Sequence, residues 1–311
     1  MVWLTYRQHR LELGTMLIGA LAVALTCVAA AVYVAGVRVQ VGLDACPSAF
    51  GTPECVARFN EYLRQTGQLR GLPVALYVYP EVVAAFLAGP IFARDFERGT
   101  HRLVWTQGIT RLRWVVAKLA IVLCTAVVAG IIVASVGGMP HEFMLGSIGP
   151  WSSFDFEVPV VISYLVFAIS LGAAAGVLLR RTVVAMLASL LLFVGPRILV
   201  ESKLRPSFMP PATLPAGGPN VTPVPADAWH LGVRYVYSSG VDFPQDQYDA
   251  LMRNFRGGDF YAYLSSHDAF AVSFYHPADR YWVFQSIETA IFLGMSLVLV
   301  LFTVWLVRRR A

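Results

Sequence analysis

Three ionisable residues lie inside long apolar stretches of this 311-residue sequence: Glu81, Arg197 and Glu288. A lone charge in a bilayer is costly, so such side chains face protein or water and pair with one another. Counting helical rise places Arg197 and Glu288 at similar depth near the outer side, with Gln285 one turn above Glu288. We expect an Arg197–Glu288 ion pair or a shared polar cavity. It serves either as a structural link between the last two spans or as part of a substrate path.

Glu81 lies near the middle of its apolar stretch, where we expect no cation at its own depth. Pro80 directly precedes it and leaves backbone carbonyls without a donor, which favours a kink. A protonated or water-facing Glu81 at this kink is the stronger candidate for a translocation role.

Several kinds of catalytic motif are absent. The sequence has no G-x-x-x-x-G-K-[ST] phosphate loop, no H-E-x-x-H and no G-x-S-x-G. Its histidines do not cluster at ligand spacing, so we assign no metal, no catalytic residue and no cofactor to this chain. ATP hydrolysis, if the function needs it, must come from another subunit.

Six apolar stretches must position the polar residues. They are Leu13–Val37, Gly71–Ala93, Leu119–Pro140, Val158–Leu179, Thr182–Pro196 and Tyr281–Val307. A bilayer core of about 30 Å needs roughly 20 helical residues. Five stretches meet that length, and the fifth in order needs its continuation to Val200. We therefore predict an all-α polytopic membrane protein with six transmembrane helices and an extracellular insertion before the last one.

The charges are divided by side. With the amino terminus inside, Lys and Arg dominate the inner segments, whereas acids outnumber them in the outer ones. This distribution follows the positive-inside rule. We expect a multi-pass protein of the cell membrane with both termini cytoplasmic, in contact with lipid and not with nucleic acid. The first stretch is too long for a signal peptide, so we expect it to be retained.

The predicted organisation has four parts. They are an amphipathic interfacial helix over 1–12, helices one to five over 13–200, an extracellular domain over 201–280, and the sixth helix with a basic tail over 281–311. The first outer loop covers 38–70 and an inner loop covers 94–113. A tight inner hairpin at Arg180-Arg181 separates spans four and five, because one helix from Val158 to Val200 would be twice the bilayer thickness. Within the extracellular domain, Gln245–Arg256 follows an amphipathic helical pattern.

The first outer loop contains Cys46 and Cys55. If the loop faces an oxidising exterior, the two cysteines form a disulfide; the alternative is two unpaired thiols. A helix follows, with Thr52 as its cap, Pro53 in its first position and Gly67 at its end.

The inner loop contains a second short helix. Gly99 breaks the preceding helix, Thr100 caps a new one over His101–Gln107, and Gly108 ends it. Exposed Arg102 and Trp105 are typical anchors for docking into another protein. The alternative is an interfacial turn whose Trp105 rests among lipid headgroups.

The inner loop resembles that of permease subunits of type-2 ABC exporters. The resemblance rests on Glu97-x-Gly99-Thr100, Thr106, Gly108, Thr110-Arg111 and Lys118. It is closest to an actinobacterial branch, through the start Trp3…Arg7-Gln8-His9-Arg10, the run Phe96–Gln107 and the end His276–Trp282. The resemblance implies six spans, pairing of two permeases, and two copies of a separate ATPase subunit that binds ATP and Mg.

The same resemblance implies which residues couple the permease to the ATPase. The inner loop would be a coupling helix seated in a cleft of the ATPase, through Glu97, Gly99, Thr100, Arg102, Trp105 and Thr106. The family's outer helices before the sixth span would correspond to Gln245–Tyr275. The outer segments of this chain are longer than that pattern.

Two functions remain open at the level of sequence. The first is an exporter permease, homodimeric or paired with a similar permease, that moves an amphipathic cargo such as a drug, antibiotic, peptide or lipid. The second is a non-transporting membrane receptor or assembly protein that uses 201–280 to bind a ligand or partner. A neighbouring gene that encodes a phosphate loop would favour the first. Neither reading makes the chain itself an enzyme.

Overall fold

The computed structural model describes residues 2–46, 52–100, 106, 108–139, 150–216 and 224–310. They form two compact units. The helical unit comprises Met1–Ser147, Ser153–Val200 and Gln285–Ala311, and the sheet unit comprises Ile148–Ser152 and Glu201–Phe284.

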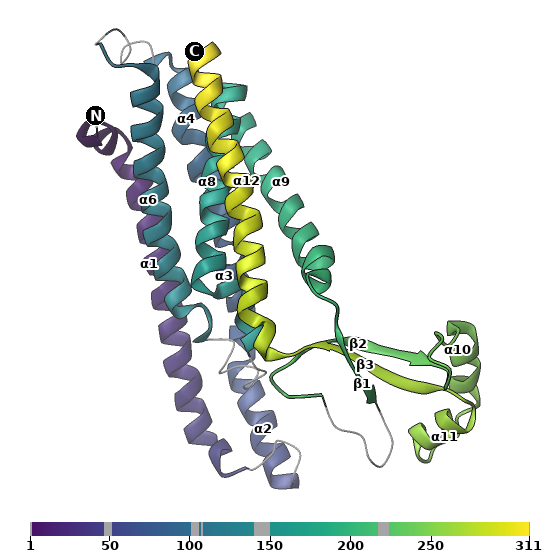
Figure 1. The fold of residues 1–311 in the computed structure, drawn as a ribbon. Helices are drawn as coiled ribbons and strands as arrows, with labels where there is room; N and C mark the ends of the chain where they lie inside the picture. The colour runs from purple at the N-terminus through teal and green to yellow at the C-terminus, as the bar shows by residue number, and fades with distance from the viewer. Residues whose placement is uncertain are drawn as a thin grey trace. The chain divides into compact units, whose positions relative to one another are not determined.

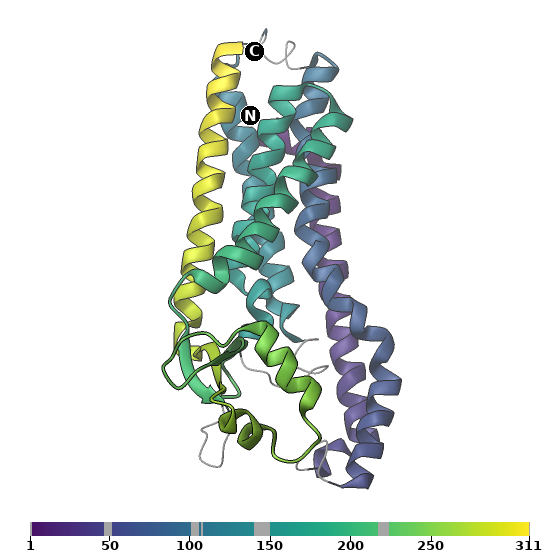
Figure 2. The same cartoon turned by 90° about the vertical axis from the view of Figure 1, so that its right-hand side faces the viewer.

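The helical unit is a bundle whose helices run along its length (Figures 1 and 2). Its helices are α1 (Val2–Val41), α2 (Pro53–Thr66), α3 (Leu72–Val82), α4 (Gly89–Glu97), α6 (Arg111–Gly137), α8 (Val158–Leu179), α9 (Thr182–Leu199) and α12 (Tyr281–Arg310). A π-helical segment, Val83–Ala88, joins α3 to α4, and a second, Val200–Leu204, continues α9. Both ends of the chain lie at the same end of the bundle.

Six helical segments among the described residues are long and apolar enough to cross a membrane. They are His9–Val41, Leu76–Glu97, Arg111–Gly137, Pro150–Leu179, Thr182–Ser207 and Ala278–Arg309. The prediction of an all-α polytopic membrane protein with six spans is confirmed. The fifth span reaches its length through the continuation beyond Pro196, as the sequence required.

The first helix differs from the prediction of a separate amphipathic helix over 1–12. Helix α1 runs unbroken from Val2 to Val41, because no proline interrupts it. Its far end packs against α2 through Val34, Val37 and Tyr62.

The helix cap and the disulfide predicted in the loop over 38–70 are present in the structure. The Thr52 hydroxyl accepts a hydrogen bond from the Cys55 backbone N–H at 3.2 Å and caps α2, in which Pro53 is the first residue. Cys46 and Cys55 form a disulfide. Arg58 donates to the Gly42 carbonyl at 2.8 Å, which also ties this loop to α2.

Helix α8 is the central element of the bundle: 89% of an 18-residue apolar stretch of this span is buried. It approaches α4 so closely that a Cβ atom on Gly172 would clash with Ala88, and one on Gly176 would lie 2.8 Å from the Ala93 backbone nitrogen. Absence of a side chain at these two positions therefore permits the contact.

The turn between α8 and α9 is the predicted tight hairpin. Arg180 adopts a left-handed conformation with φ of 55° and ends α8, and α9 begins at Thr182. The helix of the third span begins at Arg111, after the Thr110 cap and ahead of the uncharged stretch that starts at Leu119.

The sheet unit contains three antiparallel strands, which the sequence did not predict. They are β1 (Ala212–Ala216), β2 (Trp229–Val236) and β3 (Phe270–His276), in the order β1-β3-β2 (Figure 1). The predicted amphipathic helix is present as α10 (Gln245–Asn254), and α11 (Phe260–Ser266) follows it.

The expectation of helices throughout Gln245–Tyr275 is wrong at its end, where β3 lies. In β3 the buried residues Ala271 and Ser273 alternate with more exposed neighbours, which is the period of a strand.

An aromatic cluster lies beside the sheet, with the Trp151 and Trp229 rings 5.3 Å apart and His276 against Phe284 at 4.7 Å. His276 is fully buried and its Nε2 donates to the Pro206 carbonyl at 3.0 Å.

The contact between α4 and α8 yields a stability prediction. Gly172→Ala adds a methyl group where Ala88 leaves no room, so we expect a loss of about 1–3 kcal/mol through overpacking. Thermal denaturation of the purified chain in detergent measures it. Gly294→Ala in α12 is the matched control, because nothing lies within 4 Å of the added atom. Equal melting temperatures for the two variants would contradict the close contact.

Burial of His276 yields a pH prediction. Desolvation of the imidazole, reinforced by the nearby Arg280 charge, lowers the pKa of His276 below its ordinary value of 6.5. The unfolded state therefore binds the proton more readily, and the stability of the sheet unit falls as the pH drops below about 6.5. Near-ultraviolet circular dichroism of the tryptophan cluster, followed during melting at about pH 7.5 and pH 5, measures the change. His276→Gln keeps an N–H donor but does not titrate, so this variant should lose that part of the pH dependence.

Candidate functional site

The base of the inner loop is the first candidate site. Helix α4 ends at Glu97, and Gly99 has a left-handed φ of 69°, so the predicted break at Gly99 is confirmed. Thr100 and Thr106 are both helical. Residues 101–105 and 107 lie outside the described part of the chain, and with them the predicted docking residues Arg102 and Trp105. Past the loop, the Thr110 hydroxyl accepts from the Arg113 N–H at 3.3 Å and caps α6.

A buried ion pair stands at this base. The Lys118 ammonium lies 2.5 Å from Asp95 Oδ2, and the two residues are 1% and 5% exposed. The ammonium also lies 4.8 Å from the Phe92 ring centroid and 5.2 Å from that of Trp114, a cation–π arrangement. Asp95 Oδ1 accepts a hydrogen bond from the Thr100 hydroxyl at 3.1 Å. The pair thus connects α4, α6 and the first residue of the loop helix.

The pair is not apparent from the sequence when Lys118 is placed at the cytosolic start of the third span. The Thr110 cap of that span is the signal that points to it. A helix capped there starts at Arg111, and Lys118 then lies two turns inside it.

Glu97 contacts the start of α9, whereas the resemblance implied a contact with an ATPase. Its carboxylate accepts from the backbone N–H of Thr182 at 2.9 Å and from the Thr182 hydroxyl. A carboxylate at the first residue of a helix satisfies a free N–H group and lies at the positive end of the helix dipole. Glu97 therefore holds the start of α9.

The second candidate site lies within the spans, at Glu81 and Arg197. Arg197 Nη1 lies 2.6 Å from Glu81 Oε1 and donates to the Tyr77 carbonyl at 2.9 Å. The guanidinium lies 3.7 Å from the Tyr77 ring centroid and 4.5 Å from that of Tyr164. Arg197 is 3% exposed and Glu81 8%. The two opposite charges neutralise each other inside the bundle.

Of the two alternatives predicted for Arg197 and Glu288, the direct ion pair is wrong, and so is the expectation that Glu81 has no cation at its depth. Depth was counted along straight helices, whereas Pro80 and Pro196 lie inside the helices that carry Glu81 and Arg197, and proline bends a helix. Glu288 instead accepts from the Tyr164 hydroxyl at 2.5 Å. Tyr164 therefore connects the ion pair to Glu288 by its ring and its hydroxyl, and the sequence analysis did not single it out.

Gln285 has a different partner from those predicted. Its Nε2 donates to the Phe154 carbonyl at 2.8 Å. The Tyr164 hydroxyl also lies 3.1 Å from Asp155 Oδ1, so the polar network continues towards the residues that precede α8.

The ion pair sits at two similar irregularities. Pro80-Glu81 precedes the π segment Val83–Ala88, and Pro196-Arg197 precedes the π segment Val200–Leu204. Such segments often occur at functional sites. Glu81 Oε2 and Arg197 Nε are buried and make no hydrogen bond within the described part of the chain. One N–H···O contact therefore joins the two charges. Each side chain still has one polar atom that could bind a further partner.

The described residues contain no group of three or more side chains suited to a metal ion. A family model described as "ABC-2 membrane transporter related" matches residues 17–205. The chain belongs to this ABC-2 related family. The match includes the base of the inner loop, Glu81 and Arg197, and ends before Gln285 and Glu288. Searches of curated proteins and of solved structures found no match.

Membership of the ABC-2 related family makes the chain an ABC transporter permease and a multi-pass membrane protein. It also implies pairing with an ABC ATPase subunit. Both polar clusters of this ABC-2 related chain thus lie in the region that defines the family, whereas β2, β3, α10 and α11 lie outside it.

The ion pair yields a double-mutant prediction. Glu81→Gln leaves the buried Arg197 charge uncompensated and should cost about 3–5 kcal/mol. Glu81→Gln combined with Arg197→Met removes both charges and should recover most of that loss. Thermal denaturation in detergent of the wild type, both single variants and the double variant gives the coupling energy. Additive losses would show that the two side chains do not interact.

Proposed function

We propose that the chain is the permease subunit of an ATP-driven exporter that works as a pair. The observation that carries the proposal is the family match over residues 17–205. Separate ATPase subunits bind ATP and Mg, and the inner loop over 94–113 receives their movement. The chain itself performs no catalysis in this scheme.

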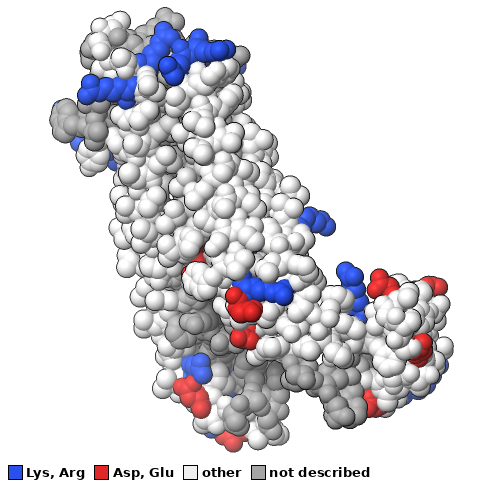
Figure 3. Space-filling model, in the orientation of Figure 1, with Lys and Arg blue, Asp and Glu red and all other residues white. Residues whose placement is uncertain are grey.

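The charge distribution supports a cytosolic position for that loop. Lys and Arg gather at the end of the helical unit where the C-terminus lies, and an uncharged surface follows below it (Figure 3). The last turn of α4 lies at the same end (Figure 1). By the positive-inside rule this end faces the cytosol, with both termini, and the protein resides in the cell membrane.

An amphipathic cargo fits the character of the spans. Most of their surface is apolar, and the Glu81–Arg197 pair with Tyr164 supplies one polar position within them. Drugs, antibiotics, peptides and lipids share this combination of an apolar body and a few polar groups.

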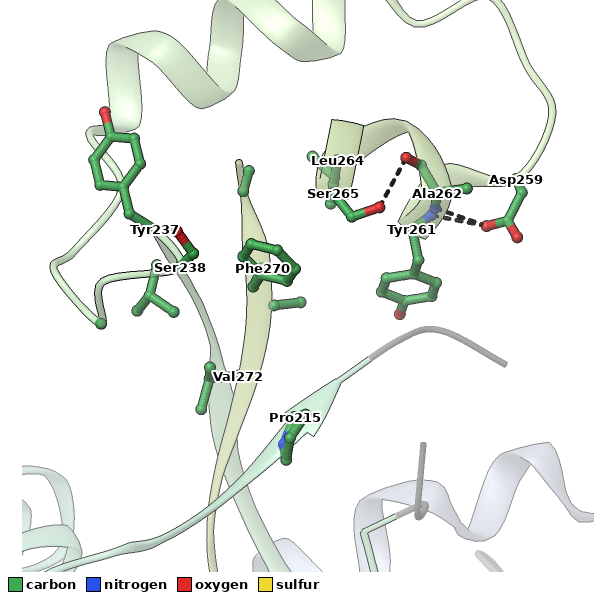
Figure 4. Close-up of a pocket in the computed structure, with 14 residues that line it drawn as sticks. Pro215, Tyr237, Ser238, Asp259, Tyr261, Ala262, Leu264, Ser265, Phe270 and Val272 are labelled. Carbon is green, nitrogen blue, oxygen red and sulfur yellow. Dashed lines mark hydrogen bonds between the residues drawn. The ribbon is translucent and has the colours of Figure 1, made fainter. Parts of the chain in front are cut away.

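A pocket in the sheet unit favours a second candidate function, that of a receptor. It has a volume of about 640 Å³, within the usual range of ligand sites. Tyr261, Phe270, Val272 and Pro215 are among its lining residues, and Asp259 lies at its rim (Figure 4). The walls are mainly aromatic and aliphatic, and Asp259 Oδ1 already accepts the backbone N–H groups of Tyr261 and Ala262, so the pocket suits an apolar ligand. On this reading no ATPase couples to the chain.

Alanine at the two docking positions tests the exporter. In the complex that co-purifies with its ATPase and is reconstituted in lipid vesicles, Arg102→Ala with Trp105→Ala should leave ATP hydrolysis active but reduce its response to cargo by about tenfold, as expected for loss of an interface anchor. Hydrolysis is measured across a panel of amphipathic dyes and peptides.

Thr213→Ala is the control, because Thr213 is an exposed residue of β1 in the sheet unit. Failure of any ATPase to co-purify with the wild-type chain would favour the receptor. An unchanged cargo response in the double-alanine variant would count against docking through the inner loop.

A further inference from the structure

The last turn of α4 makes contacts in four directions. Arg94 pairs with Glu12 of α1 at 2.9 Å, and Asp95 pairs with Lys118 of α6 at 2.5 Å. The Phe96 ring lies 5.5 Å from the guanidinium of Arg180, which ends α8. Glu97 holds the start of α9 through Thr182. Four consecutive residues thus contact four different helices.

Helix geometry explains this pattern. An α-helix has about 3.6 residues per turn, so four consecutive side chains point around the whole circumference. Arg94 and Glu97 are exposed and reach their partners at the surface, whereas Gly89–Ala93, Asp95 and Phe96 are buried. A displacement of this turn must therefore move the neighbouring helices or break the contacts.

The four contacts differ in strength. Arg94 is 44% exposed on its side chain, so water screens its pair with Glu12. The Asp95–Lys118 pair is buried, where electrostatic attraction is stronger and separation leaves unpaired charges. Asp95 alone also accepts from Thr100, the first residue beyond the Gly99 break. Among the described residues, this hydrogen bond links the start of the loop to the bundle.

We propose that Arg94–Glu97 is the joint that distributes movement of the inner loop among four other helices, with Asp95 as its positioning residue. The proposal rests on the proposed function, because it assumes that an ATPase moves the loop. The joint also reaches the ion pair in the spans. Glu97 and Thr182 connect α4 to α9, and Glu81 and Arg197 connect the same span two to the same helix α9 farther along. Movement of the loop is therefore transmitted to that ion pair along both helices that carry it, span two and α9.

Distance measurements on the complete complex test the joint. Spin labels are attached to cysteines at Ile131 of α6 and Leu199 of α9, both exposed, in a Cys124→Ser background. Pulsed electron resonance then gives the distance distribution without nucleotide and with ATP and vanadate, for the permease with its co-purified ATPase in lipid nanodiscs. Asp95→Asn should retain the bound ATPase and its hydrolysis, while the nucleotide-induced shift of the population falls by about tenfold, a typical size for coupling between sites.

Thr100→Val is the second variant. It removes only the hydroxyl that donates to Asp95, leaves the buried pair intact, and should reduce the shift in the same direction even if Asp95→Asn does not fold. Ser170→Ala is the matched control, since it removes a buried hydroxyl that bonds only to its own helix in the described structure. Its shift should equal that of the wild type.

The outcomes separate the two proposals. A full nucleotide-induced shift in Asp95→Asn, or in Thr100→Val where Asp95→Asn does not fold, with the ATPase bound, would overturn the joint and leave the exporter function standing. A wild-type complex that binds an ATPase but shows no nucleotide-induced shift would overturn the proposed function, and the joint with it. Loss of ATPase binding in Thr100→Val would also overturn the joint, because the hydroxyl would then serve docking.

Discussion

Charges buried among apolar helices must keep an opposite charge beside them, because separation inside a low-dielectric interior costs several times what it costs in water. This constraint governs how the spans of this chain meet. Asp95–Lys118 fixes α4 against α6, and Glu81–Arg197 fixes the kinked span two against α9. Span two takes part in both pairs, so its position is determined at its middle and at its inner end. Apolar contacts alone would let these helices shift along one another. The ion pairs fix the position of each helix along its neighbour.

Packing around α8 adds a second constraint on the same span. Gly172 and Gly176 let the α4 backbone lie directly against α8, and the cluster of buried residues that includes Phe92, Trp114 and Leu165 closes around this contact. Helices that lack a strong hydrophobic drive to associate in lipid gain from such close approach of backbones. Span two is thus held by shape on one side and by charge on two others.

Much of this architecture could be predicted from the sequence, and the missing part has a physical reason. Long apolar runs, the Thr52 and Thr110 caps and the Gly99 break are local signals, and the structure has elements at each. The two partners of each ion pair are far apart in the sequence, so no local signal indicates them. Arg197 bonds Glu81 instead of Glu288 because Pro80 and Pro196 change which residues of the two helices are level with each other, and Lys118 reaches Asp95 because α6 starts at Arg111, after the Thr110 cap. The sheet was missed because β3 alternates over only seven residues among many aromatics.

The unbroken first helix has a consequence of its own. At about 1.5 Å per residue, the 40 residues of α1 extend roughly twice the thickness of a bilayer core. A helix of this length cannot fit within the hydrocarbon layer, so one part of it lies in water together with α2. The Cys46–Cys55 disulfide joins the segment that follows α1 to α2 there. Glu12, near the other end of α1, pairs with Arg94, so this one helix connects the last turn of α4 to α2.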